Sequence, residues 1–342
     1  MEGKYILRIE QPWIKCYTSH AHLLSILQCD EKTYCWIFSN FLNLYMNKDI
    51  KKNDWGEFYR PLPYETRIFD SCKWLNIQKI RRELVVGSKE KLLQFVSNEL
   101  KDGYYVHLAI EHKYITSFAT NNHWHDALVY GIDIENNMVY LQDVFIHGHY
   151  ERRTISIDEF ADAVMLCRVP EDDIDYMNNS IYSYKIKENC DYVYDVENIK
   201  HFVQQYYDET IPEYWVLYNF DDSKNIEYGM GIYKALCNYI RELDLSVDEI
   251  TFRPFYLLKD HFLIMQKLFE WLKENEKYNP TDIDKVTKQY DAILSVADTA
   301  NFLLILMNKT KKDKKREALE YINQMCEMEK ALRPDIQNIL ST

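Results

Sequence analysis

Apolar residues recur along the first hundred positions of the chain with the spacing of helices. Three segments, 16–29, 34–47 and 88–101, carry apolar side chains every three or four positions, which is typical of a helix with one buried face. Ser88 stands three residues before Lys91 at the start of the last segment, where a hydroxyl can cap a helix. We therefore predict three helices in this region, the first of which begins near Cys16.

The pattern changes after the Asp102-Gly103 pair, a turn signal. Three short runs rich in β-branched and aromatic residues follow, at 104–111, 125–133 and 138–145, and such runs predict strands. Asn136-Asn137 separates the last two runs in the manner of a hairpin turn. The first half of the chain therefore predicts helices followed by an antiparallel sheet.

The remainder of the chain is helical in its periodicity. Apolar stripes run through 195–208, 228–243, 253–274, 281–307 and 313–330. We predict an α+β protein with a domain at 1–168, a linker at 169–194 and a helical bundle at 195–342. The second half would form this bundle from antiparallel helices.

Charge and cysteine content limit the class of protein. A net charge of -13 is unsuited to binding a phosphate backbone, so we expect no nucleic-acid partner. The N-terminus lacks the apolar stretch of a signal peptide, and no 18-residue run is free of charge, which predicts a soluble cytoplasmic protein without a membrane partner. Eight cysteines without a CxxC pair favour reduced thiols.

Cys16 is the cysteine whose position suggests chemistry. A thiol in the first turn of a helix lies at the positive end of the helix dipole, which stabilises the thiolate. Acyl transfer also needs donors for the oxyanion, and the Cys16 N–H and the amide of Gln11 could supply them. The alternative is that Cys16 is a small buried apolar residue.

A nucleophilic thiol needs a base, and His125 is our candidate. It begins a strand whose same-face neighbours are small, which leaves room for a packed helix, and Asp143 follows on the next strand, where its carboxylate could orient the imidazole. His123 and Asp126 are the competing assignments, although strand alternation sends Asp126 to the opposite face. A structural histidine and an aspartate that caps a loop remain the alternatives for His125 and Asp143.

The order Gln11, Cys16, His125, Asp143 is similar to that of papain-like cysteine enzymes. More closely, the Cys-Tyr-Thr start of the first helix and the segments DGYYV, HDALVYGID and YLQDVF resemble the N-terminal domain of the butirosin biosynthesis protein H family over residues 5–165. The helical half also resembles protease-like enzymes that form amides in closthioamide biosynthesis. Two differences from papain-like proteases are the absent Cys-Gly-Ser-Cys-Trp signature and an aspartate where many have asparagine.

The resemblance implies a papain-like N-terminal domain and a cysteine-dependent acyltransferase. Such an enzyme would move an acyl group from the phosphopantetheine arm of an acyl or peptidyl carrier protein to a small amine, in natural-product biosynthesis. It would need no cofactor of its own. The alternatives are a thioesterase, a cysteine peptidase, or an inactive scaffold with the same fold.

Three further features carry less weight. His147-Gly148-His149 lies near His123 and His125 in sequence, but no ligand set with a recognised spacing completes it, so we predict no metal. The basic run 309–316 could dock an acidic carrier protein or simply be a solvated helix connection. The 28 tyrosines are expected mainly in packing, with some lining a substrate pocket.

Overall fold

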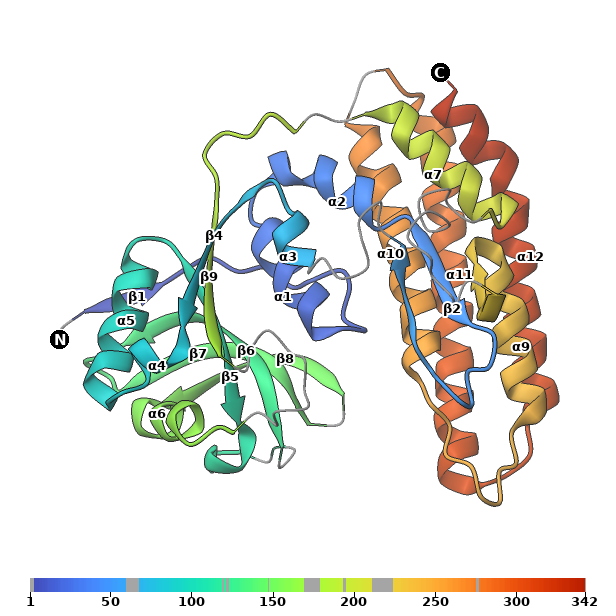
Figure 1. Cartoon of the computed structure of the whole chain (residues 1–342). Coiled ribbons are helices and arrows are strands. Elements are labelled where there is room, and N and C mark those ends of the chain that lie inside the picture. Colours follow the sequence, from blue (N-terminus) through green and yellow to red (C-terminus); the bar gives the residue numbers. More distant parts are fainter. Residues whose placement is uncertain are drawn as a thin grey trace. The chain divides into compact units, whose positions relative to one another are not determined.

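The chain divides into two compact units, each made of two separate stretches of sequence (Figure 1). The computed structural model describes residues 3–59, 68–118, 120, 123–146, 148–168, 179–192, 195–210, 224–274 and 277–341. One unit comprises Met1–Thr33 and Arg67–Tyr192, and the other comprises Tyr34–Thr66 and Val193–Thr342. The mixture of helices with antiparallel sheets confirms the α+β class.

The predicted domain boundaries differ from these units in two places. Residues 34–66 belong to the helical unit, because their strands pair with a strand from the second half of the chain. The predicted linker at 169–194 contains strand β9 (Ser180–Ile186), which lies between two strands of the first unit's sheet. Residues 169–178 of that linker lie outside the described part of the chain.

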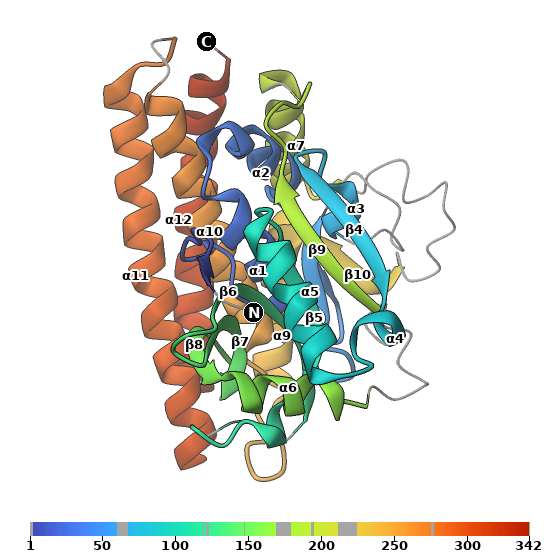
Figure 2. The same cartoon turned by 90° about the vertical axis from the view of Figure 1, so that its left-hand side faces the viewer.

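The first unit is a twisted antiparallel sheet with helices on both faces (Figure 2). Its strands follow the order β4-β9-β5-β6-β7-β8, and β1 pairs with the far end of β6. The elements of this unit are β1 (Lys4–Ile6), α1 (Thr18–Leu27), η1 (Glu31–Thr33), α3 (Ile68–Ser71), β4 (Leu75–Arg81), α4 (Arg82–Val85), α5 (Lys89–Lys101), β5 (Tyr105–Glu111), η2 (His112–Tyr114), β6 (Trp124–Asp133), β7 (Met138–Ile146), β8 (His149–Ser156), α6 (Ile157–Met165) and β9.

The two faces of this sheet have different surroundings. Ala127, Val129 and Leu141 lie on one face, in a core that α5 and α6 complete. Helix α5 therefore packs against β6 on the face of the small residues Ala127 and Val129, where the sequence predicts room for a helix. Helix α1 packs on the opposite face, where the side chain of Gln142 donates a hydrogen bond to Ser25.

Local signals place most of these elements where the sequence predicts them. The Ser88 hydroxyl accepts a hydrogen bond from Lys91 N and caps α5. Asn137 adopts φ 56° in the β6–β7 turn, a left-handed conformation that asparagine tolerates well. Ser156 and Glu159 form a reciprocal capping box at the start of α6.

The second unit is a bundle of long helices beside a small sheet of order β10-β2-β3. The predicted helix over 34–47 is wrong in its second half: the helix ends at Asn40, and the next buried segment is a strand because β3 and β10 pair with it. The elements are α2 (Tyr34–Asn40), β2 (Asn43–Asn47), β3 (Gly56–Tyr59), α7 (Val196–Asp208), β10 (Ile226–Tyr228), η4 (Gly229–Gly231), α9 (Ile232–Glu242), α10 (Arg253–Lys273), α11 (Pro280–Thr310) and α12 (Lys315–Leu340).

Helix α11 is the helix of the described residues that is long and apolar enough to cross a membrane by length and composition. Its buried positions recur every three or four residues, from Ile283 to Met307, and it packs between α10 and α12. This pattern is the one expected of a helix with one face in the core of a bundle.

A buried polar cluster crosses the helical bundle. The Glu329 carboxylate is fully buried and accepts hydrogen bonds from Tyr206 and Tyr233 at 3.0 and 2.8 Å. His261 Nε2 lies 3.2 Å from its other oxygen. Close by, Gly229 has φ +51°, and a Cβ there would lie 2.0 Å from the backbone oxygen of Tyr206.

Candidate active site

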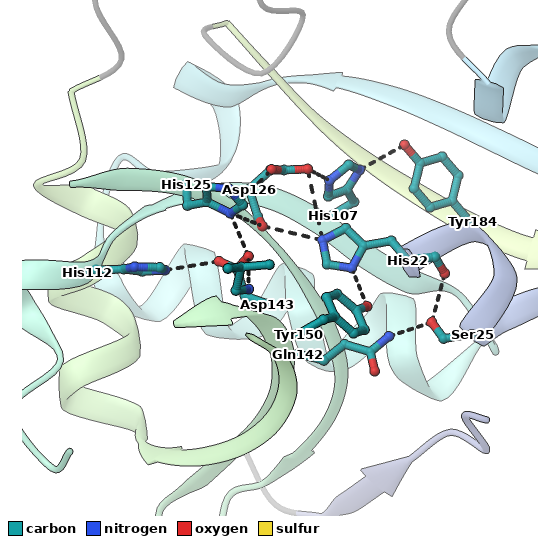
Figure 3. Close-up of polar contacts among 11 residues, drawn as sticks. His22, Ser25, His107, His112, His125, Asp126, Gln142, Asp143, Tyr150 and Tyr184 are labelled. Atoms are coloured by element: carbon teal, nitrogen blue, oxygen red, sulfur yellow. Dashed lines mark hydrogen bonds and ion pairs between the residues drawn. The ribbon is translucent and has the colours of Figure 1, made fainter. Parts of the chain in front are cut away.

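His125 and Asp143 meet at the start of β6, as the hairpin predicted (Figure 3). His125 Nδ1 lies 2.5 Å from Asp143 Oδ1 and 3.3 Å from the Asp126 backbone oxygen. Both partners are acceptors, so Nδ1 carries the proton. Every hydrogen bond that the structure gives His125 uses Nδ1, and the side chain is 25% exposed. Nε2 is thus the nitrogen able to exchange a proton with a reactant.

Asp143 holds a second imidazole that the sequence analysis did not identify. His112, in η2, is fully buried and its Nε2 lies 3.0 Å from Asp143 Oδ2. The two oxygens of the Asp143 carboxylate therefore each bond one imidazole ring, which fixes the orientation of the carboxylate toward His125. The sequence held no local signal for this contact, because η2 reaches Asp143 only through the pairing of β5 with β6.

The surroundings of the pair favour its charged form. Burial by itself would lower the pKa of His125, but the charge and hydrogen bond of Asp143, assisted by Asp126, raise it to about 10. Burial would raise the pKa of Asp143, whereas His125 and His112 hold it below its usual range. At neutral pH the pair is therefore an imidazolium beside a carboxylate.

Cys16 lies two residues before α1 and is partly buried. Helix α1 begins at Thr18, and Tyr17 occupies its N-cap position, with no side-chain hydrogen bond to the helix. Without a side-chain cap, the N–H groups of the first turn keep their positive potential for a nearby anion such as a thiolate.

Contacts along α1 show which way its N-terminus points. Ser25 is bonded to Gln142, which pairs with Leu128 of β6, and His22 Nε2 lies 3.3 Å from the oxygen of Asp126. A step toward the N-terminus of α1, from Ser25 to His22, therefore corresponds to a step toward the start of β6, from Leu128 to Asp126. The N-terminus of α1, which Cys16 precedes, therefore points toward the end of β6 that carries His125, although strand alternation places His125 with Ala127 on the opposite face of the sheet.

Five other thiols are poor nucleophile candidates. Burial raises the pKa of each of them, to about 11 for Cys167, and a raised pKa leaves little thiolate at neutral pH. The other four are Cys29, Cys72, Cys237 and Cys326. All eight cysteines lie within the described residues, and none forms a disulfide.

Gln11 is not held as an oxyanion donor by its surroundings. Its side chain is exposed, and its backbone oxygen accepts a hydrogen bond from Gln28 Nε2 at 3.0 Å. The buried amide of Gln28 also accepts from Trp13 N at 2.9 Å. Gln28 therefore fixes the segment that leads to Cys16, a role that the sequence did not reveal.

The competing assignments have other surroundings. Asp126 lies on the α1 face, as strand alternation predicted, and its Oδ2 is 2.8 Å from His107 Nε2. His123 lies edge-on to His125, with ring centroids 5.8 Å apart and an interplanar angle of 88°, and burial lowers its pKa. His147 lies outside the described residues, and His149 is exposed on β8. The described residues with metal-ligand chemistry that converge are instead His22, His107 and Asp126.

Comparison of the chain with protein-family models and with curated proteins identifies no relative. No protein-family model matches the chain, and no curated protein is significantly similar to it.

Proposed function

We propose that this protein is a cysteine-dependent acyltransferase with a papain-like N-terminal domain, which forms an amide from a carrier-bound thioester and a small amine. The observation that carries the proposal is the His125–Asp143 pair, with Nε2 free of hydrogen bonds to described residues, at the end of the sheet toward which the α1 N-terminus points. A thiol before a helix and an oriented imidazole are the two parts that such chemistry requires.

The first half of the reaction transfers the acyl group to the enzyme. The Cys16 thiolate attacks the thioester carbon, and the new C–S bond forms as the bond to the phosphopantetheine sulfur breaks. The departing sulfur takes the proton of His125 Nε2. Asp143 keeps the ring oriented through Nδ1 during this transfer.

The second half releases the amide. The neutral His125 takes a proton from the amine as the amine nitrogen attacks the acyl carbon, and the bond to Cys16 sulfur breaks. Thiolate and imidazolium are thereby restored. The net charge of -13 favours the approach of a cationic amine. The absence of disulfides among the eight cysteines agrees with a cytoplasmic location, which belongs to the same proposal.

The test measures acylation of the full chain by a thioester of N-acetylcysteamine, a mimic of the phosphopantetheine arm. Intact-mass and peptide analysis should show one acyl group on Cys16, and a diamine should convert it to amide. Cys16→Ser should abolish both. Cys29→Ser is the matched control, because Cys29 is also partly buried and its sulfur lies 3.3 and 3.4 Å from the backbone oxygens of Arg8 and Ser25.

Two outcomes would overturn the proposal in different ways. Absence of an adduct on wild-type Cys16, or an adduct unchanged in Cys16→Ser, would remove the nucleophile and favour a scaffold protein. An adduct that yields only free acid at every diamine concentration would assign a thioesterase or peptidase instead. A product that depends on the amine and on Cys16 supports acyl transfer.

A further inference from the structure

Three side chains with metal-ligand chemistry converge on the α1 face of the sheet, apart from the His125–Asp143 pair (Figure 3). His22 comes from α1, His107 from β5 and Asp126 from β6. One nitrogen or oxygen of each lies within 4.8 Å of those of the other two. Segments far apart in the sequence thus supply one set of ligands.

The distances suit a small cation between the three side chains. His107 Nε2 is 2.8 Å and His22 Nε2 is 3.9 Å from the same carboxylate oxygen, Asp126 Oδ2. Ligand bonds of about 2.0–2.1 Å in a tetrahedral site put ligand atoms roughly 3.4 Å apart. Side-chain movements of less than about 1 Å bring each of the two imidazole nitrogens to that spacing from Asp126 Oδ2, since these two separations lie on either side of it.

The outer nitrogens of both imidazoles are already oriented by tyrosines. His22 Nδ1 lies 2.6 Å from the Tyr150 hydroxyl, and His107 Nδ1 lies 3.1 Å from the Tyr184 hydroxyl. A tyrosine oxygen can accept the Nδ1 proton of a neutral ring, which leaves the Nε2 lone pair for a metal. Hydrogen bonds of this kind to the outer nitrogen are the usual support of a metal-binding histidine.

Two side chains of the cluster are buried, and the third is partly exposed. The side chains of His22 and His107 are fully buried, whereas that of Asp126 is 16% exposed. A cation can therefore reach the carboxylate first and then exchange water for the imidazoles. Two neutral imidazoles and one carboxylate are ligands that zinc and neighbouring first-row divalent ions prefer.

We propose that His22, His107 and Asp126 bind a first-row divalent cation, for which zinc is the probe. The ion joins α1 to β5 and β6, so its binding stabilises the unit that carries Cys16. The proposal does not depend on acyl transfer, because zinc affinity and the thermal midpoint are measured without the thiol chemistry, although Asp126 also contacts His125.

The test uses the full chain, stripped of metal with a chelator and then titrated with zinc by calorimetry. We expect one zinc ion per chain and a rise in the thermal midpoint on binding. Asp126→Asn and His22→Gln, which keep polar groups of similar size, should each weaken binding at least tenfold. His201→Gln is the control, because His201 is an exposed histidine of α7 and should leave affinity unchanged.

A measurement on the wild type guards against variants that fail to fold. X-ray absorption of the zinc-loaded protein should show imidazole and oxygen neighbours and no sulfur. No stoichiometric binding, a sulfur neighbour, or equal binding by folded Asp126→Asn and His22→Gln would overturn the proposal. Loss of acyl transfer with intact zinc binding would affect only the proposed function.

Discussion

Glu159 ties the loop after η2 to the start of α6, and replacing it tests how that loop is held. One carboxylate oxygen accepts from Thr116 N, Thr116 Oγ1 and Ser117 N at 2.7–3.0 Å. The other accepts from Ser156 N and Oγ at 3.1 and 3.0 Å. Gln at 159 offers a single acceptor oxygen and no charge, so one side of this arrangement must be lost.

The pKa of Glu159 gives the size of the effect. Burial would raise it, but the donated hydrogen bonds lower the pKa from 4.5 to about 2. At about 1.36 kcal/mol per pKa unit this corresponds to about 3.4 kcal/mol. Glu159 is partly exposed, and solvent screening reduces the value to about 1–2 kcal/mol. Local opening should therefore become roughly 5–30 times more frequent in Glu159→Gln.

Hydrogen exchange of the peptide containing Thr116 and Ser117 measures this opening directly. The folded pKa is lowered, so the contribution of Glu159 is complete above pH 4.5 and declines as pH falls toward 2. Less than about half should remain at pH 3. Glu135→Gln, at an exposed glutamate of the β6–β7 turn, is the matched control. Equal exchange of wild type and Glu159→Gln at pH 7, or a difference that persists undiminished at pH 3, would refute the reasoning.

Three other substitutions have defined outcomes. Asp143→Asn removes the charge that orients His125, and amide formation should fall by about 10²–10⁴-fold in a rate assay if the proposed mechanism holds; an unchanged rate would exclude this role. Glu329→Ala leaves buried hydroxyls and an imidazole without their acceptor, and urea unfolding should show a loss of about 3–5 kcal/mol. Gly229→Ala places a methyl group against the backbone oxygen of Tyr206 and should destabilise the same unit by more than about 2 kcal/mol, whereas little change would mean that η4 can shift.

Two errors of the sequence-based prediction, at residues 43–47 and at β9, arise from pairing between strands. Residues 43–47 are apolar enough for either a helix or a strand, and the pairing with β3 and β10 makes them a strand. The linker prediction is wrong for β9 (Ser180–Ile186), because its neighbours in the sheet are β4 (Leu75–Arg81) and β5 (Tyr105–Glu111), much earlier in the chain. The hydrogen bonds of β2 with β10, and those of β9 with β4 and β5, join segments that are remote in sequence.

In the candidate site too, contacts between neighbouring segments were predictable from the sequence, and contacts between remote segments were not. His125 and Asp143 could be paired from the sequence because a single hairpin joins their strands. His112 could not, since it reaches Asp143 through the packing of a different element. The exposure of Gln11 and the role of Gln28 likewise follow from the path of the chain before α1.

The sequence by itself determined the features that short-range interactions specify. Ser88 marks a helix start, alternating residues mark β5 to β7, and the Asn137 turn joins two of these strands. Only the tertiary structure decided that His22, His107 and Asp126 converge and that each unit is assembled from two stretches. The reason is that caps, turns and periodicity depend on neighbours within about ten residues, whereas strand order and buried polar contacts depend on which surfaces meet after folding.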